Sequence, residues 1–132
     1  MRRFGRSLLG PACVIVAFVA CAAPPKSADG PAPAAPSIER AAWDAIAGGA
    51  VVVDVRTDAE FRQGHLPEAI HIPYDEIVAR RAELPADQNR PIVLYCRSGR
   101  RSGIARQSLE QLGFTNAINA GGYEALMQAR PH

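Results

Sequence analysis

The sequence predicts an α/β fold, in which a central parallel sheet is covered by helices on both faces. Two continuous apolar runs, residues 50–55 (AVVVDV) and 91–96 (PIVLYC), have the composition of strands that are buried on both sides. Segments with apolar residues at helical spacing alternate with these runs along the chain. Alternation of strands and helices is typical of a parallel sheet, and ligands of such sheets bind beyond the carboxyl ends of the strands.

The first predicted helix begins after Ser37, the expected N-cap, and ends at the glycine pair 48–49. The apolar strand 50–55 follows it directly. The segment TDAEFRQG, residues 57–64, predicts a short helix capped by Thr57 or Asp58.

The second half of the chain continues the alternation. AIHIP, residues 69–73, predicts a short strand that ends at Pro73, because proline has no N–H for the ladder. DEIVARRAEL, residues 75–84, predicts a helix before the long strand 91–96. The remaining expected elements are a helix at 102–114 that buries Ile104, Ala105, Leu109 and Leu112, a strand at 115–119, and a helix at 121–129.

The N-terminal region predicts an exported protein. Arg2, Arg3 and Arg6 precede a short apolar run and then small residues, as in a signal peptide over residues 1–20. The sequence FVAC, ending at Cys21, resembles a bacterial lipobox, so lipidation of Cys21 and a periplasmic, membrane-anchored protein are expected. Two alternatives stay open: ordinary cleavage near residues 20–22, which gives a soluble periplasmic protein, and an uncleaved anchor.

The domain organisation follows from a change in composition. Residues 21–36 are rich in proline and alanine and predict an extended tether. Residues 37–132 form the predicted folded domain. Apart from the three leader arginines, the twelve remaining basic residues nearly balance the thirteen acidic ones, so the charge gives no argument for binding nucleic acid.

The only cysteine of the predicted folded domain is Cys96. Exported proteins usually pair their cysteines, so an unpaired one suggests a working thiol; the alternative is an inert, buried cysteine. Cys96 lies in the segment YCRSGRRS, residues 95–102, at the end of a predicted strand and just before a predicted helix. Unpaired N–H groups at a helix N-terminus favour a thiolate, which is a nucleophile. The surrounding arginines suit an anionic substrate.

The loop YCRSGRRS resembles the active-site loop of the rhodanese-like sulfurtransferases. The segment VVVDVRTDAEFRQGHLPEAIHIP, residues 51–73, is similar to the first strand, Asp-x-Arg element and Gly-His loop of that family, and GGYEAL, residues 121–126, is similar to its Gly-Gly-aromatic turn. The resemblance covers residues 37–130. A short exported chain of this kind resembles the phage-shock-type thiosulfate sulfurtransferases.

This resemblance implies a mechanism without a cofactor. Cys96 takes a sulfane sulfur from an anionic donor such as thiosulfate, becomes a persulfide, and passes the sulfur to cyanide or a thiol. The expected substrate-binding residues are those of the loop: Arg97, Ser98, Gly99, Arg100, Arg101 and Ser102. Arg97 and Arg101 are expected to orient the donor. Asp54 and Arg56 are expected to pair or to brace the loop, and His65 to stabilise a turn.

Two departures from the family pattern are Glu68, where glycine is usual, and Leu126, where an aromatic residue is frequent. Three alternative functions stay open. A cysteine phosphatase or arsenate reductase has an arginine at the sixth position after the cysteine, where this chain has Ser102. A non-catalytic binding module and a redox role for Cys96 are the others. No cluster of residues predicts a metal site.

Overall fold

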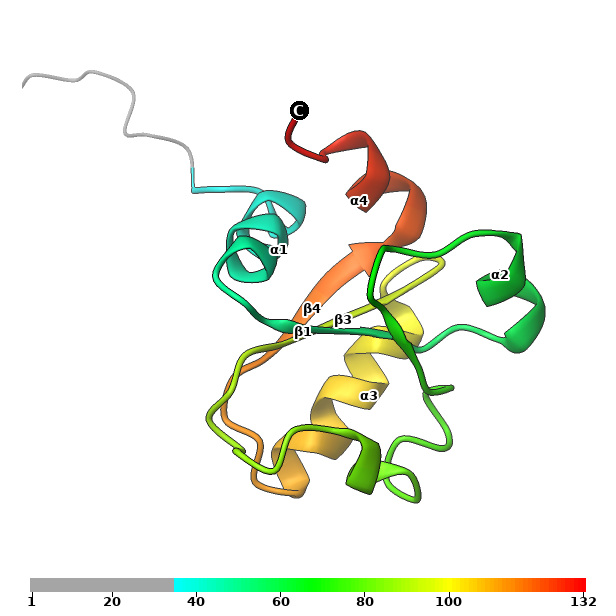
Figure 1. Cartoon of the computed structure of the whole chain (residues 1–132), viewed down its shortest axis with the longest axis vertical. Coiled ribbons are helices and arrows are strands. Elements are labelled where there is room, and N and C mark those ends of the chain that lie inside the picture. Colours follow the sequence, from blue (N-terminus) through cyan, green and yellow to red (C-terminus); the bar gives the residue numbers. More distant parts are fainter. Residues whose placement is uncertain (1–34) are drawn as a thin grey trace, which may run out of the picture. The chain divides into compact units, whose positions relative to one another are not determined.

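The computed structural model describes residues 35–132 and contains a parallel sheet with the strand order β2-β1-β3-β4 (Figure 1). The strands are β1 (Val51–Asp54), β2 (Ile70–His71), β3 (Ile92–Cys96) and β4 (Ala117–Gly122). Each neighbouring pair is parallel, which confirms the predicted α/β fold class. The proposed leader, the lipidation site Cys21 and almost all of the tether lie outside the described residues, so the division of the chain into domains stays a prediction.

The helices occupy the positions that the alternating pattern predicts, with one exception. They are α1 (Ile38–Ala47), α2 (Asp58–Gln63), the short 3₁₀ helix η1 (Arg81–Glu83), α3 (Arg100–Gln111) and α4 (Tyr123–Gln128). Ser37 caps α1 as predicted, because its side chain accepts a hydrogen bond from the N–H of Arg40. Thr57 caps α2 through a capping box with Glu60.

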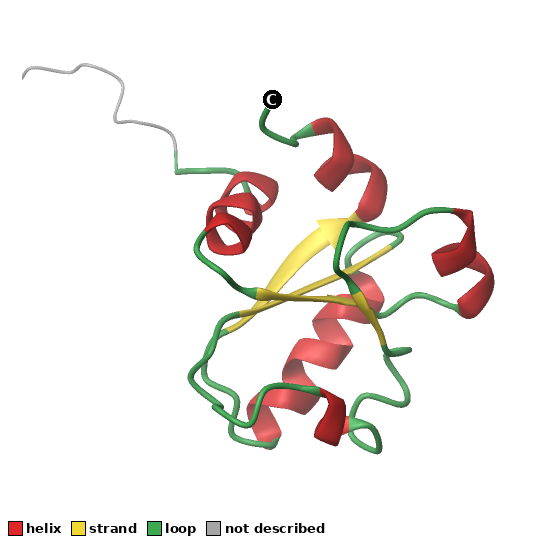
Figure 2. Ribbon diagram, in the orientation of Figure 1, coloured by secondary structure: helices red, strands yellow, loops and turns green. Residues whose placement is uncertain are grey.

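Helices cover both faces of the sheet, so each face has its own apolar core (Figure 2). α3 lies on one face, whereas α1 and α4 lie on the other (Figure 1). On the α3 face the core includes Val53, Val55, Leu94, Ala105 and Leu109. On the other face it includes Ala42, Val52, Val93, Tyr95 and Leu126. All five residues of β3 are buried, so the strand that carries Cys96 runs through the middle of the domain.

The predicted helix at residues 75–84 is wrong. This segment forms consecutive turns followed by η1 (Arg81–Glu83). A ten-residue helix is marginal by itself, so tertiary contacts decide the conformation of such a segment. Ile77 is fully buried in the α3-side core, and the Arg80 guanidinium donates to the carbonyl of His71. These two contacts hold the segment as consecutive turns and a 3₁₀ helix in place of the predicted α-helix.

The helix after β3 begins at Arg100, two residues earlier than predicted; its apolar side is confirmed at Ala105, Leu109 and Leu112 and is wrong at Ile104. Ile104 is 42% exposed, whereas Ser102, Ala105 and Leu109 are buried. The sequence pattern favoured the apolar Ile104 for burial, but the helix turns the small polar Ser102 inward instead. Ser102 is turned inward because its hydroxyl contacts Cys96 and Asn119 in the interior.

Within residues 35–132, no helix is long and apolar enough to cross a membrane.

Candidate active site

Cys96 is the last residue of β3, at the carboxyl end of the sheet, and the chain turns sharply after it into α3. Gly99 makes this turn with φ of 91°, a left-handed conformation that favours glycine. A Cβ atom at Gly99 would lie 3.1 Å from the Cα of Gly121, so the loop also packs closely against the end of β4. The sequence therefore places the thiol inside a tight loop between two strand ends.

The sulfur of Cys96 is held by hydrogen-bond donors of this loop. The N–H of Gly99 donates to Sγ at 3.0 Å, and the hydroxyl oxygen of Ser102 lies 3.5 Å from Sγ. Burial opposes ionisation, but the Ser102 hydroxyl and the N–H groups of Ser102, Ser98 and Gly99 outweigh it and lower the pKa of the Cys96 thiol. The site favours a thiolate. Cys96 itself is buried beneath this loop.

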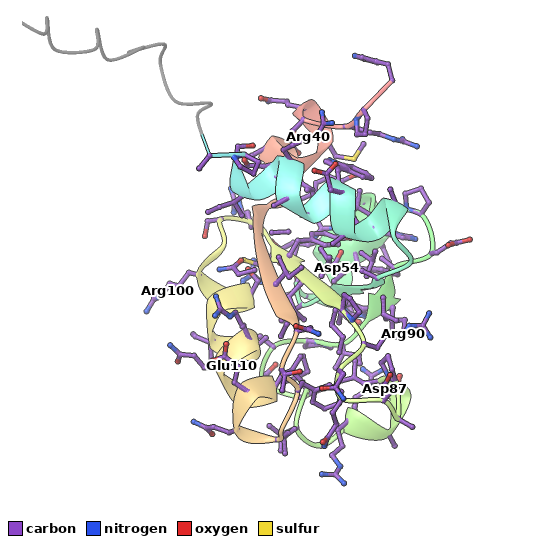
Figure 3. The ribbon with its side chains drawn as sticks, turned by 90° about the vertical axis from the view of Figure 1, so that its left-hand side faces the viewer. Arg40, Asp54, Asp87, Arg90, Arg100 and Glu110 are labelled. Atoms are coloured by element: carbon purple, nitrogen blue, oxygen red, sulfur yellow. The ribbon has the colours of Figure 1, made fainter. Side chains whose placement is uncertain are left out.

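The three loop arginines lie in different surroundings. Arg97 and Arg100 are exposed, and Arg100 extends away from the ribbon at the start of α3 (Figure 3). Arg101 instead forms a bidentate ion pair with Glu60 of α2, with both N–O distances at 2.8 Å. Hydrogen bonds to Glu60 raise the pKa of Arg101, and attraction to Cys96 adds to this effect. The guanidinium of Arg101 is therefore engaged with a carboxylate, unlike the free anion-orienting group that the sequence suggests.

Two separate pockets border the loop. The first has a volume of about 440 Å³ and is lined by Arg56, Glu60, Gln63, Gly64, Arg97, Tyr123 and Glu124. The second, of about 390 Å³, is lined by Tyr74, Ser98, Arg100, Arg101 and Ile104. The predicted binding residues are thus divided: Arg97 faces one pocket, and Ser98, Arg100 and Arg101 face the other.

Asp54 and Arg56 form a buried ion pair at the end of β1. The Nη2–Oδ2 distance is 2.6 Å, and the side chains are 0% and 6% exposed, respectively. Arg56 also donates to the carbonyl of Gly64 and stacks on the ring of Tyr123, with 4.3 Å between its Cζ and the ring centroid. Figure 3 shows Asp54 in the interior of the domain. The two residues pair with each other and connect β1 to the wall of the first pocket.

The side chains of His65 and His71 contact backbone carbonyl groups. Nδ1 of His65 lies 3.0 Å from the carbonyl of Phe61, in agreement with the turn-stabilising role that was expected. Nε2 of His71 lies 2.9 Å from the carbonyl of Arg56. Neither contact involves the Cys96 sulfur.

The residues 35–132 contain no group of three or more His, Cys, Asp or Glu residues that could hold a metal ion.

Sequence reasoning missed two residues of the site, Glu60 and Asn119. Glu60 binds Arg101, and its position in Thr57-x-x-Glu60 is a recognisable capping-box signal. Asn119 lies on β4 and accepts a hydrogen bond of 2.7 Å from the Ser102 hydroxyl. A polar residue inside the apolar strand segment AINA is also a signal, because such a side chain needs hydrogen-bond partners.

Comparisons with known proteins agree with this geometry. Residues 39–129 match the sequence profile of the rhodanese-like domain. The thiosulfate sulfurtransferase PspE of Escherichia coli K12 is 40% identical over 70 residues, which cover 53% of this chain and 67% of the relative. A sulfurtransferase of Allochromatium vinosum is 43% identical over 72 residues, which cover 54% of this chain and 65% of the relative, slightly less than two thirds of its length.

Solved structures give the same result. A rhodanese with anions from E. coli superposes with a TM-score of 0.58 at 36% identity, covering 63% of this chain and 95% of that one. The human single-domain sulfurtransferase TSTD1 has a TM-score of 0.55 at 29% identity, covering 65% of this chain and 88% of that one. With a matching profile over most of its length, a parallel sheet of the same fold and a thiol loop at the carboxyl end of that sheet, this chain belongs to the rhodanese-like domain family.

Proposed function

We propose that the protein is a thiosulfate sulfurtransferase that carries sulfur as a persulfide on Cys96. The observation that carries this proposal is the set of donors directed at one sulfur atom, the Gly99 N–H at 3.0 Å and the Ser102 hydroxyl at 3.5 Å. These donors favour the thiolate, which is the reactive form of a cysteine nucleophile. Relatives that are named sulfurtransferases support sulfur transfer in general.

The proposed first step is attack of the Cys96 thiolate on the outer sulfur of thiosulfate. A new S–S bond forms to Cys96 while the S–S bond of thiosulfate breaks, and sulfite leaves with the bonding electron pair. The loop N–H groups then hold the negative charge of the outer persulfide sulfur, as an oxyanion hole holds oxygen. Arg97, which is exposed on the rim of the first pocket, is the guanidinium available to attract the dianionic donor.

The proposed second step returns the enzyme to its starting state. A nucleophile, either cyanide or a thiolate, attacks the outer sulfur, the persulfide bond breaks, and the Cys96 thiolate is the leaving group. The product is thiocyanate with cyanide and a new persulfide with a thiol. A leaving group with a lowered pKa departs more easily, so the same hydrogen bonds assist both steps.

The test is the intact mass of the full chain with Cys13→Ser and Cys21→Ser, so that Cys96 is the only thiol. Brief treatment with thiosulfate should add the mass of one sulfur atom, and cyanide should remove it with formation of thiocyanate. Cys96→Ser in the same background should gain nothing. If no sulfane donor modifies Cys96, the transfer mechanism is wrong and a binding module becomes the better explanation; turnover of phosphate esters or arsenate would instead identify the phosphatase or reductase alternative.

We also propose that the chain is exported and lipid-anchored through Cys21, on the basis of the leader and the lipobox-like FVAC sequence. The test is fractionation of cells that express the full chain, with metabolic labelling by a fatty acid. The label and membrane association should both be lost in Cys21→Ser. A soluble periplasmic protein without label would identify ordinary cleavage instead.

A further inference from the structure

Asn119 is a polar residue within the sheet, next to the active-site loop. The register of β4 places it beside Leu94 of β3, and Gly122 beside Cys96. The residues near it on the strand, Ala117 and Ala120, are buried in the two cores. Asn119 itself is half-buried, and its hydrogen-bond partners all belong to the active-site region.

The amide of Asn119 has one orientation that satisfies its neighbours. Its Oδ1 accepts from the N–H of Gly121 at 3.0 Å, and its Nδ2 donates to the carbonyl of Gly99 at 3.0 Å. If the amide were reversed, its NH₂ group would face the N–H of Gly121 and its oxygen would face the carbonyl of Gly99, and both hydrogen bonds would be lost. Asn119 is thereby fixed between the end of β4 and the turn of the loop.

Oδ1 of Asn119 is also the nearest acceptor to the Ser102 hydroxyl. The Ser102 Oγ lies 2.7 Å from Asn119 Oδ1, 3.0 Å from the Gly99 carbonyl and 3.5 Å from the Cys96 sulfur. A hydroxyl has one proton to donate, and the shortest contact favours Asn119 as its acceptor when the thiol is neutral. When Cys96 ionises, the sulfur becomes a stronger acceptor, and the proton can rotate to it at the expense of the hydrogen bond to Asn119. Asn119 therefore does not hold Ser102 by a hydrogen bond in the thiolate state.

Gly99 depends on Asn119 whether the thiol is neutral or ionised. Its N–H donates to the sulfur at 3.0 Å, while its carbonyl accepts from Asn119. Gly99 has a φ of 91°, and glycine has more conformational freedom than other residues, so contacts on both sides of it help to hold the turn. Through Gly99, Asn119 therefore holds one of the N–H groups that donate to the Cys96 sulfur.

We propose that Asn119 is a positioning residue for sulfur transfer, which holds the Gly99 turn so that the Gly99 N–H stays directed at the sulfur of Cys96. This proposal rests on the proposed function of Cys96 as the sulfur carrier. Asn119 acts through Gly99, which it contacts.

The main variant is Asn119→Leu, which keeps the branched shape and removes every polar contact. Without the amide, the Gly99 turn is no longer held, so its N–H is less well directed at the sulfur and the thiolate loses stabilisation. We expect the pKa of the Cys96 thiol to rise by about one unit, which corresponds to about tenfold less thiolate at a pH below the pKa. The rate of persulfide formation from thiosulfate at neutral pH should fall by a similar factor.

The matched control is Asn116→Leu. Asn116 is an asparagine of the same segment, and its Nδ2 donates to the carbonyl of Asn89 at 2.6 Å, not to the loop. All variants are made in the full chain with Cys13→Ser and Cys21→Ser. The measurement is the pH dependence of the alkylation rate with iodoacetamide, and Asn116→Leu should leave its midpoint unchanged.

A double-mutant comparison tests whether the effect passes through Gly99 or through Ser102. Asn119→Leu should raise the thiol pKa in a Ser102→Ala background as well, because the Gly99 turn is released there too. If Asn119→Leu does not fold, Asn119→Ala provides the test, because it removes the amide without adding a charge near the thiolate. We expect Ala to raise the midpoint as Leu does.

An unchanged or lowered midpoint in Asn119→Leu, or a shift equal to that of Asn116→Leu, would overturn the positioning role. The result is independent of the transfer reaction, because alkylation reports the thiol alone. If the chain with Asn119 takes no sulfur from any donor, the proposed function fails even where Asn119 shifts the alkylation profile. If sulfur is transferred but Asn119→Leu behaves like the control, only the positioning role fails.

Discussion

Glu60 and Arg101, which are 41 residues apart in sequence, form an ion pair through two hydrogen bonds of 2.8 Å each. The side chains are only 23% and 25% exposed, respectively. The same carboxylate accepts hydrogen bonds from the N–H and hydroxyl of Thr57, which caps α2. Glu60 thus links the N-terminus of α2 to the first turn of α3, where the Cys96 loop ends.

Glu60→Gln tests the effect of this link on the thiol. Glutamine can keep the capping box but removes the negative charge, so Arg101 exerts an uncompensated positive charge on Cys96. We expect the pKa of the Cys96 thiol to fall and the free energy of unfolding to decrease by about 1 kcal/mol. The control is Glu110→Gln, which removes the exposed ion pair with Arg106 on the same helix. A pKa shift of the same size in both variants would contradict a specific link.

The same ion pair should make the stability of the protein sensitive to acid. Hydrogen bonds from Arg101 lower the pKa of Glu60 from 4.5 to about 2. A carboxyl with a lowered folded-state pKa stabilises the protein above its ordinary pKa, and this contribution is lost as the pH falls through 4.5 toward 2. Urea unfolding across this range should show that the protein with Glu60 loses about 1 kcal/mol more than Glu60→Gln. If the free energy of unfolding falls equally in both proteins over this pH range, the Glu60–Arg101 pair does not contribute to stability.

The order of elements could be predicted because local patterns and tertiary structure agree over most of the domain. The strands predicted at 50–55 and 91–96 are apolar except for Asp54 in the first, and both are central in the sheet. The segment 75–84 could not be predicted, because contacts of Ile77 and Arg80 with distant parts of the chain override its weak helical preference. The exposure of Ile104 could not be predicted either, because burial of the polar Ser102 helps to determine which side of α3 faces inward.

The candidate site could be predicted in its centre but not in its surroundings. A cysteine between a strand and an arginine-rich helix start is visible in the sequence, and the structure places Cys96 there. The partners of Arg101 and Ser102 come from α2 and β4, distant in sequence. Whether an arginine of the loop is free, as at Arg97, or paired, as at Arg101, depends on such long-range contacts and cannot be read from the loop alone.

The pH dependence of persulfide formation should reflect the lowered thiol pKa. The Ser102 hydroxyl and the loop N–H groups hold the pKa of Cys96 below its ordinary value of 9.0. The rate of sulfur uptake from thiosulfate should therefore rise with pH with a midpoint below pH 9.0. In Ser102→Ala, which lacks one donor, the midpoint should move upward. A midpoint at or above the ordinary value in the unchanged protein would contradict stabilisation of the thiolate by the loop.

Glu68→Gly should stabilise the protein. Glu68 has a φ of 60°, the only positive φ of a non-glycine residue in the described part of the chain. The turn thus keeps a backbone conformation suited to glycine, which is usual at this position in the family. A left-handed conformation costs an L-residue roughly 1–2 kcal/mol, partly offset by the greater freedom of glycine in the unfolded chain. We expect the urea midpoint to rise by the equivalent of about 0.5–1 kcal/mol with an unchanged slope. Glu68→Ala, which retains the strain, should show no such gain.

Gly122→Ala should damage the active-site loop through a steric effect alone. Gly122 has a φ of −92°, which any residue can adopt, but its Cβ would lie 2.7 Å from the carbonyl oxygen of Arg97. The Arg97 peptide has to move, and the loop that holds the Cys96 sulfur moves with it. Overpacking of this kind costs about 1–3 kcal/mol, and the displaced donors should slow persulfide formation by about tenfold to a hundredfold.

Gly48→Ala is the matched control for this variant. Gly48 has a φ of −78° and its Cβ would lie 3.3 Å from the carbonyl oxygen of Ala45, at the end of α1 and away from the loop. We expect this variant to form the persulfide at the unchanged rate. Mass spectrometry after timed thiosulfate treatment measures the rate in both proteins. Normal sulfur uptake by Gly122→Ala would show that the contact between the end of β4 and Arg97 does not determine the geometry of the loop.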